Sequence, residues 1–288
     1  MIGPSAMVEP ARTRPAELSR PFSGDDLFAI CRICQGPASP GHHCCWSCQQ
    51  VCEQLGGRVP PVVPITNFVK GSELHRALSG YKASPAPRLR AARAALLQEL
   101  LCGFLASHAA CLLRPPPDSN LGPHLVVPVP SSTPDRPRRK GHPLVVLLDA
   151  VLSSLKESED GPAARLVLAD CLEARSPAAG RLRARRGAFG VKEGAGLVAR
   201  GALAIVIDDV FTSGSRALSA AAALEDAGML VRAVVPIGRL VRPEHNPATA
   251  AFWAVHAAGA EDIACCRLCK TASALSVRRG EVSSRVAA

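Results

Sequence analysis

Aromatic side chains are scarce in this sequence: its 288 residues include one Tyr, two Trp and seven Phe, or 3% of the chain. Proteins that bind single-stranded nucleic acid by stacking bases on rings need several exposed aromatic residues. The composition therefore argues against a base-stacking platform. It also predicts a core packed mainly with Ala, Val and Leu.

Long uninterrupted apolar runs are missing as well. The best candidate for a membrane span, residues 94–113, contains Gln98, Glu99, Ser107 and His108, which is typical of a helix inside a protein core. The first 20 residues lack the apolar segment of a signal peptide. We therefore expect a cytoplasmic protein without a membrane span, whose thiols stay reduced.

The composition that is present favours a folded, basic protein. Hydrophobic residues make up 48% of the chain, which is enough for a sizeable core and excludes wholesale disorder. The 34 Lys and Arg residues outnumber the 24 Asp and Glu residues and give a net charge of +10. This excess favours phosphorylated or polyanionic partners.

Proline-rich breaks divide the chain into four parts. We expect a disordered tail over 1–27, a Cys-rich module resembling a zinc ribbon over 28–58, a large domain over 64–240 and a C-terminal extension over 241–288.

The large domain alternates between two kinds of apolar pattern. Continuous apolar runs, typical of strands, occupy 125–129, 202–207 and 230–237, and helical periodicity occupies 74–81, 89–113, 143–155 and 216–227. Strands that are apolar at every position and alternate with helices indicate an α/β fold, with a parallel sheet covered by helices on both faces.

The segment 202–216 has the clearest chemical pattern. An apolar strand leads into Asp208 and Asp209, and a turn of Thr212, Ser213, Gly214 and Ser215 then opens a helix. Hydroxyls and backbone N–H groups at a helix start can bind an anion. Carboxylates at the carboxyl edge of a parallel sheet suit sugar hydroxyls or a magnesium-bound water. The alternative is an ordinary strand-to-helix turn in which an Asp caps the helix.

This pattern resembles the ribose-phosphate motif of type I phosphoribosyltransferases. The resemblance implies that Asp208 and Asp209 hold the 2′- and 3′-hydroxyls of phosphoribosyl pyrophosphate and serve the catalytic step. It implies that the turn from Thr212 to Ser215 cradles the 5′-phosphate of this ligand, or of ribose 5-phosphate, and that Mg²⁺ accompanies phosphoribosyl pyrophosphate. Transfer of the ribose phosphate to an acceptor, which the sequence does not identify, is the implied activity.

Further segments are similar to those of the ComF family, whose members join a phosphoribosyltransferase-like domain to an N-terminal zinc ribbon. The similar segments are Leu74 to Leu78 with Tyr81-Lys82, Val126 to Pro130, Arg138 to Gly141, Arg181, and Ala188-Phe189, so the resemblance spans about residues 28–240. It implies that Lys82, Arg138 and Lys140 lie near the pyrophosphate. It also implies two alternatives to transferase activity: a scaffold in DNA uptake, with single-stranded DNA or a DNA-uptake helicase as partner, and a ribose-phosphate sensor without turnover.

The sequence departs from the family pattern in several places. The family sequence Arg-Gly-Phe-Asn appears here as Lys140-Gly141-His142-Pro143, and an Asn of the basic stretch is replaced by Ala184. The last hydroxyl of the phosphate loop is replaced by Arg216, for which we weigh phosphate contact against a solvent-facing side chain; Ser215 is expected to cap the helix. Thr212 stands where base-salvaging relatives often have an acidic general base.

Twelve cysteines in a reducing compartment suggest metal binding before disulfides. Cys31-x-x-Cys34 and Cys45-x-x-Cys48 have the paired spacing of a structural Zn²⁺ site with four thiolates. Further cysteines and histidines are weaker candidates. Cys44, Cys52, His42 and His43 are alternative ligands; Cys265, Cys266 and Cys269 either complete a site with Cys44 and Cys52 or bind nothing; Cys102, Cys111 and Cys171 are expected to be core residues.

Overall fold

The computed structural model describes residues 28–114, 123–131, 142–157, 162–175, 182–193, 201–258 and 268–269. Several of the expectations fall outside these residues: the tail over 1–27, the proposed ligand contacts of Arg138 and Lys140, the basic residue Arg181, and the cysteines at 265 and 266.

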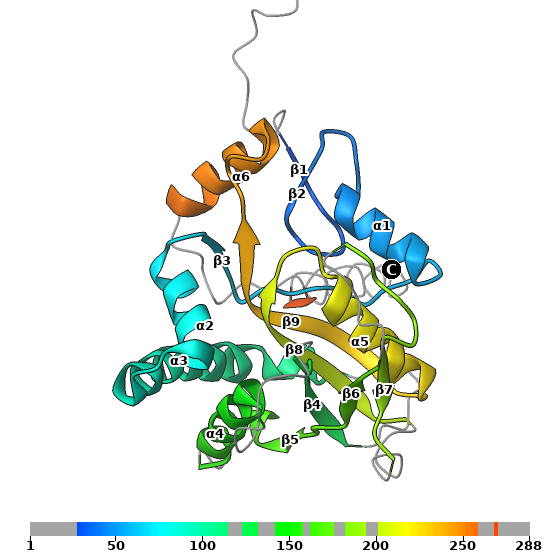
Figure 1. Ribbon diagram of the computed structural model, residues 1–288. Helices are drawn as coiled ribbons and strands as arrows, with labels where there is room; N and C mark the ends of the chain where they lie inside the picture. The colour runs from blue at the N-terminus through cyan, green and yellow to red at the C-terminus, as the bar shows by residue number, and fades with distance from the viewer. Residues whose placement is uncertain are drawn as a thin grey trace, which may run out of the picture.

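The structure is built around five parallel strands in the order β3-β9-β8-β4-β5 (Figure 1). Their bounds are β3 Thr66–Val69, β4 His124–Pro128, β5 Leu166–Leu168, β8 Leu203–Phe211 and β9 Leu230–Val241. Two small antiparallel pairs are β1 Ala29–Ile30 with β2 Pro37–Ala38, and β6 Leu172–Ala174 with β7 Phe189–Val191. The helices are α1 Trp46–Gln54, α2 Glu73–Ala83, α3 Pro87–Leu112, α4 Pro143–Glu157, α5 Ser215–Asp226, α6 Pro247–Ala258 and the short 3₁₀ helix η3 Pro162–Arg165.

Strand β8 is buried on both faces, which explains its unbroken apolar sequence. Ala204 and Val206 belong to an apolar cluster that includes Leu218 of α5, the α5-side core. Ile205 and Ile207 belong to a second cluster formed with α2, α3 and α4, the α3-side core. Side chains alternate along a strand, so a strand covered by helices on both faces must be apolar at successive positions. The expected α/β class with a parallel sheet flanked by helices is confirmed.

Helix α3 is the one described helix that is long and apolar enough to cross a membrane by length and composition. In this fold it packs against α2 and α4. Leu97, Leu101 and Leu105 are fully buried and belong to the α3-side core. Core packing therefore accounts for the apolar residues that α3 buries; buried residues make up 44% of its most apolar window.

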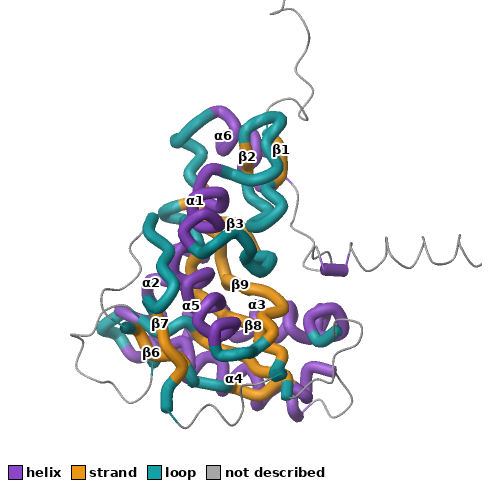
Figure 2. Tube along the Cα trace, turned by 90° about the vertical axis from the view of Figure 1, so that its right-hand side faces the viewer, coloured by secondary structure: helices purple, strands orange, loops and turns teal. Residues whose placement is uncertain are grey.

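The described part of the Cys-rich module, residues 28–58, packs directly on the sheet domain. Cys48, Val51 and Leu55 belong to the α5-side core. The side chain of Gln54 also accepts a hydrogen bond from the N–H of Ala184, at 2.6 Å. Figures 1 and 2 show β1, β2 and α6 grouped at one end of the molecule, near the carboxyl end of β9. The module and α6 therefore cover the edge of the sheet at which α/β proteins bind ligands.

Two elements extend beyond the sequence-based expectation. Strand β8 continues to Phe211, so the acidic pair lies within the strand and not after it. Helix α6 forms in a stretch that showed no clear helical period in the sequence. Its start nevertheless carries a local signal, because the side-chain oxygen of Asn246 accepts a hydrogen bond from the N–H of Thr249, at 2.9 Å, and Pro247 occupies the first turn.

Gly214 connects β8 to α5 in a conformation that excludes other residues. Its φ is +80°, in the left-handed region, and an added Cβ would lie 2.5 Å from the ring of Phe211. Both the backbone angle and the buried ring therefore require glycine here.

We predict that Gly214→Ala destabilises the protein more than Gly71→Ala does. Gly71 also has a positive φ, +85°, but an added Cβ there meets nothing within 4 Å. The control therefore loses only the backbone term of about 1–2 kcal/mol, while Gly214→Ala adds a steric term of about 1–3 kcal/mol. Denaturant unfolding of the two variants measures the difference, and equal losses would contradict the steric role of Phe211.

Candidate active site and metal centre

The candidate active site lies between β4 and β8, two neighbouring strands from which the chain continues to opposite sides of the sheet. Adjacent strands β4 and β8 are parallel, but β4 leads through α4 to β5 at one edge, and β8 leads through α5 to β9 on the other side. Helices α4 and α5 pack on opposite faces of the sheet. Such a reversal leaves a crevice outside the carboxyl ends of the two strands, which is the usual ligand position in open α/β sheets.

The acidic pair stands on β8 at this reversal. The alternation along the strand assigns Asp208 to the face of Val206 and α5, and Asp209 to the face of Ile207 and α2. The observed contacts agree, because Lys82 in the last turn of α2 forms an ion pair with Asp209. The Asp208 carboxylate accepts a hydrogen bond from the N–H of Asp209, at 2.9 Å. The structure thus brings together three of the residues that the sequence proposed for the site.

The two carboxylates have opposite pKa shifts. Burial, reinforced by the negative charge of Asp209, raises the pKa of Asp208 to about 7. Burial acts in the same direction on Asp209, but the charge and hydrogen bond of Lys82 outweigh it and hold the pKa of Asp209 below its usual value. One carboxylate is therefore already neutralised by a cation, and the other needs a proton, a metal ion or a hydrogen-bonding ligand.

The turn between β8 and α5 presents small polar groups. The hydroxyls of Ser213 and Ser215 lie 3.0 Å apart and are buried, whereas Thr212 is exposed. Gly214 is the N-cap of α5, and Ser215 is the first helical residue. The expectation that Ser215 caps the helix is therefore wrong. The N–H of Ser215 donates a weak hydrogen bond to Oγ of Ser213, at 3.4 Å. The positive end of the α5 dipole lies at this turn, which suits an anion site.

Arg216 does not have the solvent-facing side chain weighed from the sequence, and its contact with a phosphate stays a prediction. Its guanidinium is half-buried and donates a hydrogen bond to the carbonyl of Pro130, in the segment that follows β4. Val129 in the same segment donates its N–H to the carbonyl of Ile207, at 2.9 Å. These bonds fasten the Pro-Val-Pro segment beside the acidic pair.

Two side chains that the sequence did not propose as site residues also face this region. The hydroxyl of Tyr81 is buried and has no hydrogen-bond partner among the described residues, and burial together with the charges of Asp209 and Asp208 raises the pKa of its phenol. Nδ1 of His142 is also buried, with no partner in the part of the chain that the structure describes, and burial and the charge of Lys82 lower the pKa of its imidazole. Tyr81 stands next to Lys82 in the resembling segment, and that adjacency was the available signal for it.

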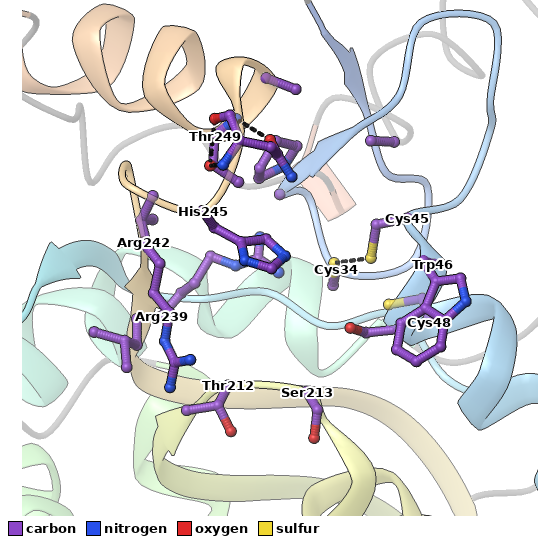
Figure 3. Close-up of a pocket in the computed structure, with 18 of the residues that line it drawn as sticks. Cys34, Cys45, Trp46, Cys48, Thr212, Ser213, Arg239, Arg242, His245 and Thr249 are labelled. Carbon is purple, nitrogen blue, oxygen red and sulfur yellow. Dashed lines mark hydrogen bonds between the residues drawn. The ribbon is translucent and has the colours of Figure 1, made fainter. Parts of the chain in front are cut away.

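A pocket of about 790 Å³ opens beside the phosphate-loop residues Thr212 and Ser213 (Figure 3). Ligand pockets in proteins usually measure about 300–1,000 Å³. Its other walls come from the Cys-rich module, from the end of β9 and from the start of α6; those residues include Cys34, Trp46, Arg239, Arg242, His245 and Thr249. Asp208, Asp209 and Lys82 are not among the lining residues. The pocket and the acidic pair are thus adjacent through the loop.

Arg239 is the most buried charged side chain of this pocket, with 5% exposure. Its guanidinium lies over the ring of Phe211, 5.3 Å from the centroid, and directly against Gly36 of the Cys-rich module. One terminal nitrogen, Nη1, has no hydrogen-bond partner among the described residues. A buried guanidinium with an unused donor suits a ligand that carries an anionic or carbonyl oxygen. The sequence could have indicated Arg239, because it is a basic residue near the carboxyl end of β9, the strand that pairs with β8.

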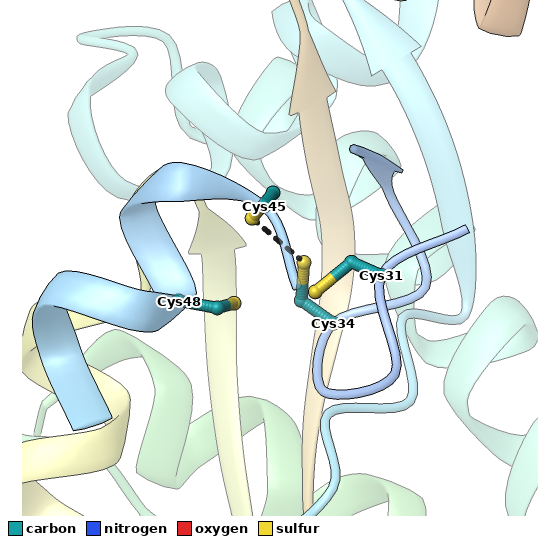
Figure 4. Close-up of side chains that lie close together, drawn as sticks. All are labelled: Cys31, Cys34, Cys45 and Cys48. Carbon is teal, nitrogen blue, oxygen red and sulfur yellow. Dashed lines mark hydrogen bonds between the residues drawn. The ribbon is translucent and has the colours of Figure 1, made fainter. Parts of the chain in front are cut away.

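Cys31, Cys34, Cys45 and Cys48 gather their sulfur atoms into one cluster (Figure 4). All four Sγ atoms lie within 4.8 Å of one another, and those of Cys34 and Cys45 are 3.7 Å apart. Tetrahedral coordination with Zn–S bonds of about 2.3 Å requires a separation of about 3.8 Å between sulfur atoms. The cluster can therefore hold a metal ion such as zinc, as the spacing predicts.

The electrostatics of this cluster also favour a cation. Hydrogen bonds from the other three thiols lower the pKa of Cys31, while contacts with Cys31 raise the pKa values of Cys45 and Cys48. One thiolate is thus stabilised at the expense of its neighbours. A metal ion removes this competition, because it stabilises all four thiolates together.

The weaker candidates for metal ligands lie in other places than the sequence suggested. Cys44, Cys52, His42 and His43 do not belong to the four-cysteine cluster. Cys269 does not join Cys44 or Cys52; it lies beside His108 and Cys111 in a second group of possible ligands. Cys111 is a core residue, as predicted, and it also belongs to this second group.

Comparisons with known proteins add no family assignment. A scan against protein-family models finds no match, and a search of curated proteins finds no significant match. The likeness to the ComF family therefore depends on the motifs of this chain alone.

We predict a pH dependence of stability that Asp208→Asn removes. Because the pKa of Asp208 is higher in the folded protein, its proton stabilises the fold at low pH, and this contribution is lost as the pH rises from about 4 to about 7. Asp209 has the opposite sign, with stability lost only below its usual range. Denaturant unfolding at pH 5.5 and 8 should show a steeper fall for the unsubstituted protein than for Asp208→Asn. Parallel pH profiles would refute the burial of a protonated Asp208.

We also predict that Cys31→Ser combined with Cys34→Ser removes about one metal ion per chain. Plasma mass spectrometry of the purified protein measures zinc and other transition metals. Cys171→Ser is the matched control, because Cys171 is also buried but belongs to neither ligand group. Full metal content in the double variant would show that this cluster is not a metal site.

Proposed function

We propose that this protein binds phosphoribosyl pyrophosphate with Mg²⁺ and transfers the phosphoribosyl group to an acceptor, as a ComF-like protein with a type I phosphoribosyltransferase fold. One observation carries the proposal: an acidic pair at the carboxyl end of a central parallel strand leads directly through a glycine turn into a helix start. This arrangement supplies hydroxyl acceptors and anion-binding N–H groups side by side, which is what a ribose phosphate requires.

The ribose hydroxyls would donate hydrogen bonds to Asp208 and Asp209. Asp208 is the stronger candidate for the first such bond, because its carboxylate has no ion pair among those of the described residues and its pKa is raised. The 5′-phosphate would lie at the start of α5, against the N–H groups and hydroxyls of Thr212 to Ser215. Ser213 and Ser215 are buried, which makes their hydrogen bonds to a ligand stronger than the same bonds in water.

The pyrophosphate would recruit the basic side chains around the acidic pair. Lys82 lies within reach, since it already contacts Asp209, and bound pyrophosphate would compete for the same ammonium group. The donor set of Asp208 and Asp209 consists of oxygens, which fits Mg²⁺. Magnesium bound with the ligand supplies positive charge that offsets the pyrophosphate.

The transfer itself would break the bond between C1 of the ribose and a pyrophosphate oxygen, and form a bond from C1 to a nucleophilic atom of the acceptor. The electron pair of the broken bond leaves with pyrophosphate, so positive charge develops on the ribose ring. Asp208 and Asp209 would position the ring, and the cationic groups would stabilise the leaving group. The acceptor would enter through the pocket that Arg239 lines, and the unpartnered Nη1 favours an acceptor with a carboxylate, phosphate or carbonyl oxygen.

We predict that Asp208→Asn with Asp209→Asn weakens Mg²⁺-dependent binding of phosphoribosyl pyrophosphate by more than about a hundredfold. The estimate assigns about 1.5–3 kcal/mol to each lost charge-assisted hydrogen bond, and 1.4 kcal/mol corresponds to about a tenfold change in affinity. Isothermal titration calorimetry with and without Mg²⁺ measures the effect. Asp149→Asn, an exposed position on α4, is the control and should bind normally.

The same titration distinguishes the alternative functions. Binding heat without release of pyrophosphate across a set of nucleophilic acceptors would favour a ribose-phosphate sensor. Binding of single-stranded DNA, with no response to phosphoribosyl pyrophosphate, would favour a nucleic-acid scaffold. Affinity for phosphoribosyl pyrophosphate that is unchanged in the double variant would mean that the acidic pair is structural, and it would overturn the proposed site.

A further inference from the structure

A second group of metal-ligand side chains lies at the C-terminal end of α3, apart from the four-cysteine cluster. It consists of His108, Cys111 and Cys269, whose Nδ1 and Sγ atoms all lie within 4.8 Å of one another. His108 and Cys111 are 1% and 8% exposed, and Cys269 is partly buried. None of the three belongs to the candidate active site or to its pocket.

The distances in this group fit tetrahedral metal coordination. Nδ1 of His108 lies 3.3 Å from Sγ of Cys269 and 3.9 Å from Sγ of Cys111. A zinc ion with Zn–N of about 2.0 Å and Zn–S of about 2.3 Å requires a separation of about 3.5 Å between nitrogen and sulfur. The two observed distances lie on either side of this value, so small side-chain adjustments would complete the geometry.

The surroundings make a shared cation more favourable than three separate polar groups. His108 is buried in the α3-side cluster of apolar residues, with its ring 4.7 Å from that of Phe104. A buried imidazole loses its hydration and needs a strong partner. A thiol is only a weak hydrogen-bond donor and acceptor, whereas imidazole and thiolate are both preferred zinc ligands.

Two of the three residues lie close together on α3, and the third comes from a distant part of the chain. His108 and Cys111 are separated by three positions on α3, which puts them on the same face of the helix. Cys269 is 161 positions away from His108 in the sequence. Its neighbour Leu268 is buried in the α3-side core, which holds Cys269 near the helix. An apolar contact and a ligand contact therefore dock the same short segment.

Other cysteines do not share these features. Cys102 lies on the same helix, but it is absent from both ligand groups. Cys171 is buried and also absent from both groups. Contact with a histidine side chain thus distinguishes Cys111 and Cys269 from Cys102 and Cys171.

We propose that His108, Cys111 and Cys269 bind a second structural Zn²⁺ ion, which fastens the segment 268–269 to α3. Nδ1 of neutral His108 and the thiolates of Cys111 and Cys269 are the ligands, and binding releases one proton from each thiol. The described residues supply three of the four ligands that a structural zinc site uses. The proposal is independent of the proposed function, because it involves different residues and a different ligand.

Zinc content after reconstitution tests this site. The full chain is treated with a chelator under reducing conditions, incubated with excess Zn²⁺, desalted and measured by plasma mass spectrometry. We expect about two zinc ions per chain for the unsubstituted protein and for Cys102→Ser, and about one for Cys269→Ser. A zinc content that Cys269→Ser leaves unchanged would overturn the proposal, whatever the total.

Two further variants separate ligation from folding. Cys269→His replaces one zinc ligand by another and should retain the second ion, while circular dichroism confirms that each variant is folded. Co²⁺ in place of Zn²⁺ gives a thiolate-to-metal absorption band that grows with the number of thiolates. The band lost in Cys31→Ser with Cys34→Ser should be about twice as strong as the band lost in Cys269→Ser, four thiolates against two. Loss of all metal absorption in the double variant, with none lost in Cys269→Ser, would also refute the site.

Discussion

The burial of β8 between two helical layers is the constraint on which the rest of the structure depends. Ala204 and Val206 face one apolar core, and Ile205 and Ile207 face the other. The same alternation continues into the acidic pair, so Asp208 and Asp209 belong to opposite faces of the sheet. Lys82 of α2 forms its ion pair with Asp209, and its charge lowers the pKa of Asp208 by less than burial raises it. The difference in pKa between two adjacent carboxylates thus follows from the geometry of one strand.

The opposite pKa shifts of Asp208 and Asp209 suit the proposed binding of a charged ligand, because only one of the two carboxylates is already paired with a cation. Lys82 neutralises one carboxylate of the pair, which limits the cost of burying two negative charges together. Burial raises the pKa of the second carboxylate, that of Asp208. A hydrogen-bonding or cationic ligand would stabilise its charged form and offset the cost of burial. Across the loop, Gly214 permits the close approach of Phe211, and this ring in turn supports the guanidinium of Arg239. The loop therefore couples the acidic pair to the pocket through packed side chains.

The Cys-rich module contributes to the site as well as to stability. Cys34, Cys45 and Cys48 line the same pocket as Thr212 and Arg239, and Gly36 lies against the guanidinium of Arg239. The hydrogen bond with Cys31 raises the pKa of the Cys34 thiol, but those with Cys45 and Cys48, together with the charge of Arg239, lower it to about 7. A metal ion in the cluster would hold one wall of the pocket in position, although it would lie outside the reacting groups. This would explain why a module with two very short strands and one helix is ordered over the sheet edge.

Structural features that depend only on residues close together in the sequence could be predicted from the sequence. The apolar run before Asp208, the glycine turn and the helix after it are encoded within 202–227, and each CxxC pair is encoded within four residues. Local backbone preferences and side-chain spacing suffice for such elements. The full length of β8 was underestimated, because acidic residues have low strand propensity and only pairing with β9 extends the strand to Phe211. The partnership of Lys82 with Asp209, the buried position of Arg239 and the meeting of His108 with Cys269 depend on how distant segments pack. Sequence spacing carries no information on such contacts, because the folded core, and not the length of the intervening chain, brings their side chains together.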